Sequence, residues 1–167
     1  MFRSRPPAPP KAAPRSVVDL FGRDAQRVVL AAEAQAQADG SAAVEVHHLL
    51  LALTAVTTPV AWTFATRGLD EAVLRDALDR RGGVPFPPSD RRVPQVPDRA
   101  APRVPFAPDT KEAMATAVMA ARRGRGTPVQ PADLAVAALG STSPTIVAVL
   151  DELGLDGTAL VQALAQV

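Results

Sequence analysis

The feature that most limits the fold of this chain is an internal duplication, in which residues 20–81 resemble residues 106–167. Over most of the unit the matching residues lie 85 positions apart: Phe21 with Phe106, Asp24 with Asp109, Ala32 with Ala117, Val44 with Val129, Leu49 with Leu134, Ala52 with Ala137 and Pro59 with Pro144. One inserted residue then moves the offset to 86: Gly68 with Gly154, Leu69 with Leu155, Asp70 with Asp156, Leu74 with Leu160 and Leu78 with Leu164. A unit of about 60 residues that occurs twice must bury the same faces in both copies.

Each copy begins with a predicted amphipathic helix. Apolar residues recur at helical spacing: Phe21, Ala25, Val28, Val29, Ala32 and Ala36 in the first copy, and Phe106, Ala113, Met114, Ala117 and Ala121 in the second. This spacing places them on one stripe of a helix. Gly40 and Gly124 are predicted to end the two helices, because glycine readily adopts the left-handed conformation found at helix ends.

Three more helices are predicted in each copy. The second helix contains HHLLLAL in one copy and ADLAVAAL in the other. The third begins after Thr58 in one copy and after Ser143 in the other. Each of these residues supplies a hydroxyl that can cap the helix, and the proline that follows it suits the first helical position. The fourth begins after Asp70 or Asp156, both good helix caps. The sequence therefore predicts an all-α fold of two tandem four-helix repeats.

Two proline-rich segments flank these units. Residues 1–16 contain five prolines and four basic residues, and residues 82–105 contain seven prolines. Proline fixes φ and removes a backbone donor, so neither segment favours regular structure. We expect a disordered basic tail (1–16), followed by one domain (17–167) in which repeat one (20–81) and repeat two (106–167) are joined by a proline-rich linker.

Composition excludes several classes of protein. With 47% hydrophobic residues the chain can form a core, while a net charge of +1 argues against a basic nucleic-acid-binding surface. The absence of cysteine excludes disulfides and thiolate chemistry. There is no apolar run of roughly 18 residues, no apolar signal-peptide core and no phosphate-binding loop for ATP. We expect a cytoplasmic protein without a cofactor and without a membrane partner.

The only two histidines, His47 and His48, precede a leucine run and align with Ala132 and Asp133. Asp133 falls in the first turn of its predicted helix, where a negative charge meets unpaired N–H groups. We predict that His48 occupies the same turn as a neutral imidazole, which can accept a backbone N–H or pack over the preceding loop. A metal ligand or general base is the alternative, but it would need a nearby cluster that the sequence does not reveal. Trp62 is predicted to lie in the core, and the alternative is an exposed tryptophan that marks a partner surface.

The stretches DLFGRDAQRVVLAAEAQAQADG and VEVHHLLLAL resemble the N-terminal domain of the Clp AAA+ unfoldases of the ClpA and ClpC class. In that family a phenylalanine, a polar stretch, a helix rich in Ala, Val and Glu, and a Thr-Glu-His-Ile-Leu-Leu-Gly-Leu box occur twice. The residues that fit this box are His48, Leu49, Leu50, Leu51 and Leu53. The residues that fit the second-repeat opening, Pro-Phe-Thr-Pro-Arg-Ala-Lys-Lys, are Phe106, Pro108 and Lys111. The resemblance covers residues 20–80 and 104–166.

This resemblance implies two four-helix repeats with pseudo-two-fold symmetry, which dock adaptors or tagged substrates for an ATPase ring. In ClpC-type domains the glutamate of each box helps bind phosphorylated arginine, but His47 and Ala132 occupy those positions here. Neither side chain can accept the fork of N–H donors of a guanidinium group. Phospho-arginine recognition in the family's manner is therefore disfavoured.

The resemblance also implies a ligand groove. In actinobacterial members, cyclic peptide antibiotics bind between the opening segment and the start of the second repeat. The candidate ligand- and partner-binding residues here are Val18, Phe21, Gln26, Phe106, Lys111 and Ala115. Val18, Gln26 and Ala115 replace a phenylalanine, an arginine and a glutamate of the family, so the groove is expected to be altered. Phe21 and Phe106 mirror each other, and both also fit as core residues in front of a helix.

We predict a non-catalytic protein- or peptide-binding module that acts as an adaptor, a competitor or a ligand-sequestering decoy in Clp-dependent proteolysis. Its expected partners are a Clp unfoldase, the adaptors or substrates of that unfoldase, or cyclic peptides, with no metal and no nucleic acid. The alternative is a small helical DNA-binding or regulatory protein, because the tail and linker are basic. Salt-dependent binding to duplex DNA would distinguish the two.

Overall fold

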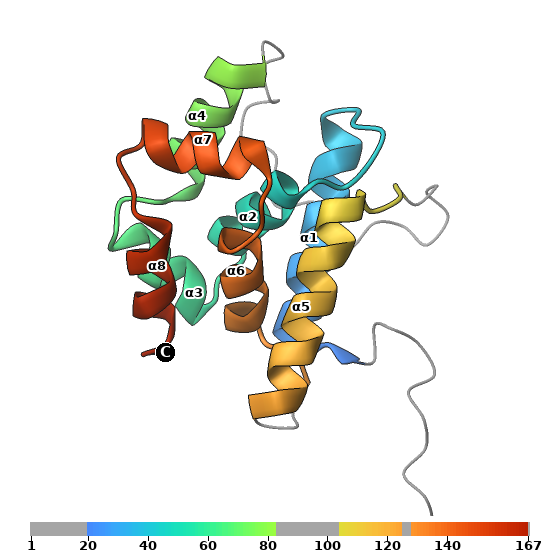
Figure 1. Ribbon diagram of the computed structural model, residues 1–167. Helices are drawn as coiled ribbons and strands as arrows, with labels where there is room; N and C mark the ends of the chain where they lie inside the picture. The colour runs from blue at the N-terminus through green and yellow to red at the C-terminus, as the bar shows by residue number, and fades with distance from the viewer. Residues whose placement is uncertain (1–19, 83–103, 125–127, 167) are drawn as a thin grey trace, which may run out of the picture.

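A computed structural model describes residues 20–82, 104–124 and 128–166, and this part of the chain forms eight α-helices (Figure 1). The helices are α1 Arg23–Ala38, α2 Val46–Ala55, α3 Pro59–Ala65, α4 Glu71–Gly82, α5 Pro108–Gly124, α6 Pro131–Leu139, α7 Pro144–Glu152 and α8 Gly157–Leu164. The predicted all-α class is confirmed. The predicted tail and Val18 lie outside the described residues, as does most of the predicted linker.

The starts of the helices reproduce the duplication seen in the sequence. The first helical residues of α1, α2 and α3 precede those of α5, α6 and α7 by 85 positions in each case, and α4 precedes α8 by 86. The inserted residue therefore falls between the start of α7 and the start of α8, and α7 has nine residues where α3 has seven. The two four-helix repeats predicted from the sequence are confirmed.

Two short backbone bridges join the repeats reciprocally. Phe21 pairs with Val129, and Val44 pairs with Phe106. The Gly22 N–H donates to the Val129 carbonyl at 2.8 Å, and its 85-residue counterpart, the Ala107 N–H, donates to the Val44 carbonyl at 3.0 Å. Exchanging the repeats converts one bridge into the other, which is the relation that a pseudo-two-fold axis requires.

Each bridge defines a seam between the repeats. We call the first the α1–α6 seam, where residues 20–27 meet residues 129–133, and the second the α2–α5 seam, where residues 44–48 meet residues 105–112. The α2–α5 seam is held by hydrogen bonds from Val44 N–H to the Pro105 carbonyl at 2.8 Å and from Ala107 N–H to Val44. Each seam therefore combines the start of a long helix of one repeat with the start of the central helix of the other.

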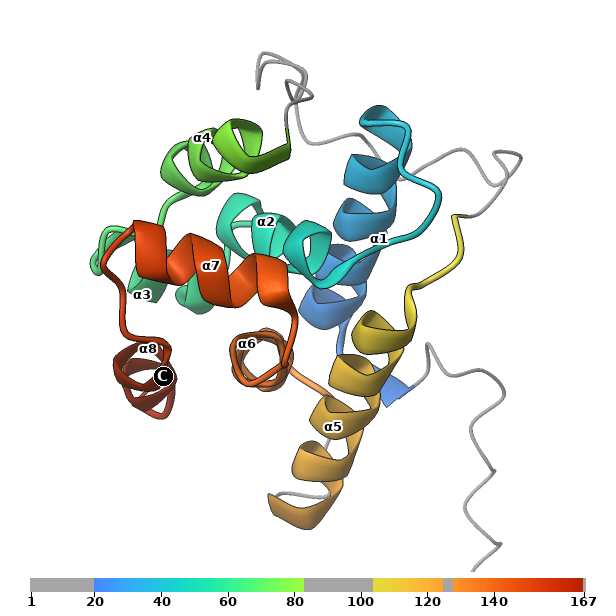
Figure 2. The same ribbon diagram turned by 45° about the horizontal axis from the view of Figure 1, so that its top comes forward.

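The core centres on α2 and α6, around which the other helices are arranged (Figure 2). Four leucines of α2 have no exposed surface: Leu49, Leu50, Leu51 and Leu53. Burying one such side chain contributes about 1.5–3 kcal/mol. Because α2 packs against α5, α6 and α7 as well as helices of its own repeat, much of this burial depends on both repeats.

Most of the predicted caps are present. The Thr58 hydroxyl accepts the Ala61 N–H at 3.3 Å, and the Asp70 and Asp156 carboxylates accept from Val73 and Thr158 at 2.9 and 2.8 Å. Ser143 precedes α7 but makes no side-chain cap bond. Gly40 ends α1 with φ of 73°, the left-handed conformation expected there.

The prediction that Trp62 lies in the core is wrong. Helix α3 buries Val60 and Phe64, which are four residues apart and share one face. Trp62 lies midway between them in sequence, so it points about 200° around the helix, away from the core. Its residue surface is 73% exposed.

No single helix of the described part is long and apolar enough to cross a membrane. Two pairs of consecutive helices, α2 with α3 and α6 with α7, together have the length and apolar composition of a membrane span. Each pair is bent at the break between its helices, and only length and composition support such a span.

Candidate functional site

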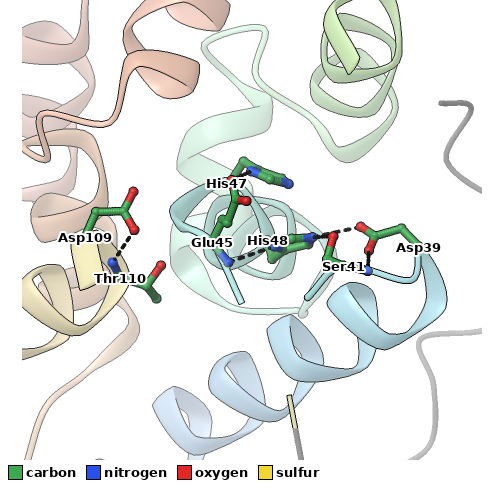
Figure 3. Close-up of polar contacts among 7 residues, drawn as sticks. All are labelled: Asp39, Ser41, Glu45, His47, His48, Asp109 and Thr110. Atoms are coloured by element: carbon green, nitrogen blue, oxygen red, sulfur yellow. Dashed lines mark hydrogen bonds and ion pairs between the residues drawn. The ribbon is translucent and has the colours of Figure 1, made fainter. Parts of the chain in front are cut away.

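The α2–α5 seam brings polar side chains of both repeats near the two histidines. Glu45 and His47 come from the start of α2, Asp109 and Thr110 come from the first turn of α5, and Asp39 ends α1 (Figure 3). The two helix starts belong to different repeats, so this cluster exists only when the repeats are packed together.

His48 closes the first turn of α2. Its Nδ1 accepts the Glu45 N–H at 2.9 Å, while the Glu45 side chain accepts the His48 N–H. Asp133 makes the same reciprocal box at the start of α6, where its carboxylate accepts the Gln130 N–H at 2.8 Å. The prediction of a helix-start histidine is confirmed, and of the two roles left open His48 takes the one that accepts a backbone N–H.

The other ring nitrogen of His48 ties α2 to the end of α1. Nε2 lies 2.8 Å from Asp39 Oδ2, and the imidazole has no exposed surface (Figure 3). Since Nδ1 accepts a hydrogen bond, the proton of the neutral ring is on Nε2, from which it is donated to Asp39. His48 thus links the start of α2 to Asp39 and the start of the loop after α1.

His47 packs against His48, with ring centroids 3.9 Å apart, and its Nδ1 lies 3.3 Å from Glu45 Oε2. Burial, together with the proximity of His48, lowers the pKa of His47 to about 4, and Asp39 opposes this shift. His47 is therefore neutral at pH 7 and adds no positive charge to the seam.

Asp39, His47 and His48 could be read as a metal site, because one ligand atom from each lies within 4.8 Å of the others. The hydrogen bonds argue against this. A metal-bound histidine normally donates its second ring N–H to an acceptor, whereas Nδ1 of His48 accepts one. Metal at Nε2 would require loss of the remaining ring proton or reversal of the tautomer, which would break the cap of α2.

The same hydrogen bonds of His48 argue against a role of this residue as a general base. Ser41 Oγ lies 3.4 Å from His48 Nε2, but Asp39 binds that same nitrogen. In a serine–histidine–aspartate triad the carboxylate binds Nδ1, so that Nε2 is free to take the serine proton. Here Nε2 already carries its proton and faces Asp39. The three side chains stabilise a turn and do not form a nucleophile.

Thr110 is a buried polar residue of this seam whose hydroxyl group has no partner among the described residues. The residue has no exposed surface, and its Oγ1 makes no hydrogen bond to any residue that the structure describes. Figure 3 shows the hydroxyl turned toward the start of α2. A buried unpaired hydroxyl costs about 1–3 kcal/mol, so it needs an explanation.

The predicted binding residues divide between the two seams. At the α1–α6 seam Phe21 is 5% exposed, and the Gln26 amide donates to its carbonyl at 2.9 Å. At the α2–α5 seam Phe106 is half-buried against the core, and Lys111 and Ala115 are exposed on α5, four residues apart. The side chain of Phe21 is therefore covered by the protein itself, whereas a partner can reach Lys111 and Ala115.

Sequence reasoning did not single out Asp39, Glu45 or Thr110 as site residues. The pairing of Asp39 with His48 depends on how a loop folds, which periodicity does not reveal. Thr110 did leave a signal, because it aligns with Ala25 and puts a hydroxyl where the first repeat buries a methyl group.

Residues 20–153 match the family model described as the Clp repeat (R) N-terminal domain. The chain belongs to this Clp N-terminal domain family. The model spans helices α1 to α7 and both seams, so the match rests on the duplicated architecture as a whole.

Two solved structures share the Clp N-domain fold. The N-terminal domain of the caseinolytic protease associated chaperone ClpD from Arabidopsis thaliana has a TM-score of 0.71 at 22% identity, covering 91% of this chain and 96% of that one. A structure described as a preliminary structural investigation of a malarial protein secretion system has a TM-score of 0.63 at 16% identity, covering 87% and 92%. At such identities the likeness concerns the fold. No curated protein sequence matched the chain.

Proposed function

We propose that this Clp N-domain-like chain is a non-catalytic module that binds a protein or peptide at the seams between its repeats. It would work in the cytoplasm as an adaptor, a competitor for adaptors or a decoy in Clp-dependent proteolysis. Its partners would be a Clp unfoldase, the adaptors or substrates of that unfoldase, or cyclic peptides.

The observation that carries this proposal is the construction of the seams. Each seam brings two helix starts from different repeats together over the core, with reachable side chains at its edge. In the α2–α5 seam these are Glu45, whose side chain is 51% exposed, and Lys111. Clp N-domains as a class bind substrates and adaptors, which supports this kind of partner. The hydrogen bonds of His48 support the absence of catalysis.

The test is binding of the purified chain to a Clp ring, its adaptors and cyclic peptides, followed by mapping of the contact through backbone amide NMR shifts. We expect dissociation constants of tens of micromolar or tighter and shifts concentrated in residues 44–48 and 105–115. An Ala115→Trp variant should weaken binding, because it adds a bulky side chain at the exposed edge of this seam. Arg122→Trp is the matched control, since Arg122 is exposed in the last turn of the same helix. Equal loss in both variants, or no binding to any of these partners, would refute the proposal.

A further inference from the structure

The duplication creates two equivalent pairs of outer helices, each with one helix from each repeat. In the first pair α3 packs against α8, and in the second α7 packs against α4. The offsets of 85 and 86 make α3 equivalent to α7 and α4 equivalent to α8. We call these the α3–α8 pair and the α4–α7 pair. Because both have the same architecture, the differences between their side chains are not required by the fold.

The α4–α7 pair is charged and is bonded internally. Helix α4 has six charged residues and α7 has two: Glu71, Arg75, Asp76, Asp79, Arg80 and Arg81, with Asp151 and Glu152. Glu152 accepts from Arg80 Nε at 2.7 Å and from Arg81 Nε at 2.9 Å. Arg81 also donates to the Ala148 carbonyl at 2.9 Å. These bonds join the end of α4 to α7 across the two repeats.

The α3–α8 pair, in contrast, has no charged residue in either helix. Helix α3 reads PVAWTFA and helix α8 reads GTALVQAL. Gln166 stands where the first repeat has Arg80, and Arg67 stands where the second has Glu152, so the ion pair between those positions has no counterpart here. The nearest charged residues along the chain, Arg67 and Asp156, lie outside the two helices.

The α3–α8 pair also carries an exposed aromatic side chain. Trp62, at 73%, is the most exposed large hydrophobic residue in the described part of the chain, and its equivalent on α7 is Val147. Neutral residues are exposed with it on or just after the two helices: Pro59, Ala65, Thr66, Thr158, Gln162, Ala165 and Gln166. The centres of protein interfaces have this composition, since they are enriched in aromatic residues and depleted of charge.

The lack of charge indicates which partner fits. In a two-fold homodimer the same surface meets itself, so a charge on it would face a like charge. A neutral helix pair avoids this repulsion. Amides and hydroxyls both donate and accept, so Thr158, Gln162 and Gln166 can bond to their own copies. A surface that selects a different protein usually offers complementary charges, which this pair does not.

We infer that the α3–α8 pair is the interface of a homodimer, in which Trp62 of each copy is buried against the other copy. Figures 1 and 2 both place α3 and α8 on the side of the molecule opposite α1 and α5. The long helices of both seams therefore stay uncovered. The inference goes beyond the proposed function, because the dimer presents two copies of each seam.

The size of the surface sets the strength of the dimer. Helices α3 and α8 have seven and eight residues, some of them buried in the core, whereas a standard interface has about 20–30 residues a side. We expect a dissociation constant of about 100 μM. At the low micromolar concentrations of thermal melts and fluorescence the chain is then monomeric. Two copies held by a common partner reach effective concentrations of about 1 mM, at which the dimer forms.

The test is the oligomeric state of the full chain from about 10 μM to about 1 mM, by sedimentation equilibrium and backbone amide NMR. The mass should rise from that of a monomer toward that of a dimer. Concentration-dependent shifts should be concentrated in residues 59–66 and 158–166, and the Trp62 emission should move to the blue over the same range. A monomer at about 1 mM, or shifts confined to other helices, would overturn the inference.

The matched pair of truncations is Trp62→Ala and Val147→Ala. Both residues are exposed, at 73% and 58%, so both variants should fold. Trp62→Ala should weaken the dimer at least about tenfold, because it removes the anchor. Val147→Ala should change it less than about twofold. Equal effects of the two substitutions would contradict the assignment of the interface.

A second matched pair tests the role of neutrality. Gln162 and Asp76 are equivalent and both exposed, so each helix tolerates the other's residue. Gln162→Asp should weaken the dimer at least about threefold, and salt should reduce this loss by screening the like charges. Asp76→Gln should leave the dimer unchanged. A Gln162→Asp protein that dimerises as tightly as the unchanged chain would show that this surface is not the interface.

Other occupants of the α3–α8 pair give different results. Protection of Trp62 from acrylamide at about 10 μM, where the chain is monomeric, would mean that the same chain covers it. A different protein that binds residues 59–66, while the chain alone stays monomeric at about 1 mM, would mean that the pair serves that protein. Either result overturns the homodimer, and neither bears on peptide binding at the seams.

Discussion

At the scale of single residues, His47 makes stability depend on pH. Burial lowers its pKa to about 4 in the folded protein, against 6.5 ordinarily. Between these values the unfolded chain binds more protons than the folded one, so stability is lost as pH falls from about 6.5 toward 4. At about 1.4 kcal/mol per pKa unit, the loss of stability from this group is at most about 3.5 kcal/mol.

His47→Ala is the variant that isolates this effect, because the aligned residue in the second repeat is Ala132. Urea unfolding of both proteins at pH 7 and pH 5 should show that the variant loses less free energy of unfolding between these two pH values. The carboxylates that titrate below pH 5 are common to both proteins, so they do not cause the difference. The imidazole proton resonances of His47 give its pKa directly. A value near 6.5, or equal losses in the two proteins, would contradict the expectation.

His48 shows how far sequence reasoning reaches at this scale. Its alignment with Asp133 predicted its place in the first turn and offered acceptance of a backbone N–H as one of two roles there, and the structure shows that role. The partner of its other nitrogen, Asp39, could not be predicted, because that contact depends on the path of the loop from Asp39 to Glu45. An alignment of repeats transfers local bonds between copies, but it cannot supply a tertiary bond that only one copy makes.

At the scale of helices, α3 gives the clearest test of side-chain placement. Trp62 is 73% exposed and Phe64 is fully buried, two residues apart on a seven-residue helix. Trp62→Ala should change the free energy of unfolding by less than about 1 kcal/mol, whereas Phe64→Ala should cost about 3–5 kcal/mol because it opens a core cavity.

Trp62 is the only tryptophan, so its fluorescence reports on this placement directly. The native protein should emit at the wavelength of a water-exposed indole and be quenched by acrylamide nearly as strongly as the unfolded protein. A blue-shifted, protected native emission, or a large loss of stability in Trp62→Ala, would mean that α3 turns the other face inward.

The error over Trp62 has a general cause. In α1 and α5 the apolar stripe extends over several turns and fixes which side faces the core. Helix α3 has two turns, Pro59–Ala65, and apolar residues at most positions, so its sequence fits more than one rotation. The choice is made by the cavity that Val60 and Phe64 fill, which belongs to the surrounding helices.

At the scale of the whole molecule, duplication makes the fold predictable and the site less so. Two copies with matching apolar positions must share one architecture, and the offsets of 85 and 86 return as offsets between helix starts. A ligand site depends instead on where the copies differ, as at Thr110 and Ala25. Whether such a difference lies at a seam or on an open surface follows from the packing of the repeats.

The reciprocal bridges imply that neither repeat is stable alone. Phe21 of the first repeat pairs with Val129 of the second, and Phe106 pairs with Val44, so each half contributes one strand-like partner to the other. Helix α2 also packs on α5, α6 and α7. Separated halves would expose these apolar faces to water, and units of about 60 residues have little burial to spare.

Fragments ending at Gly82 and beginning at Val104 test this dependence. Each alone should show no cooperative thermal transition by circular dichroism. An equimolar mixture should regain helix content and a transition whose midpoint rises with concentration, because association supplies the missing interface. The intact chain, with the same helices covalently joined, should melt at a concentration-independent temperature. Cooperative unfolding of either fragment alone would mean that a four-helix repeat is an independent domain, and that the seams form between two prefolded units.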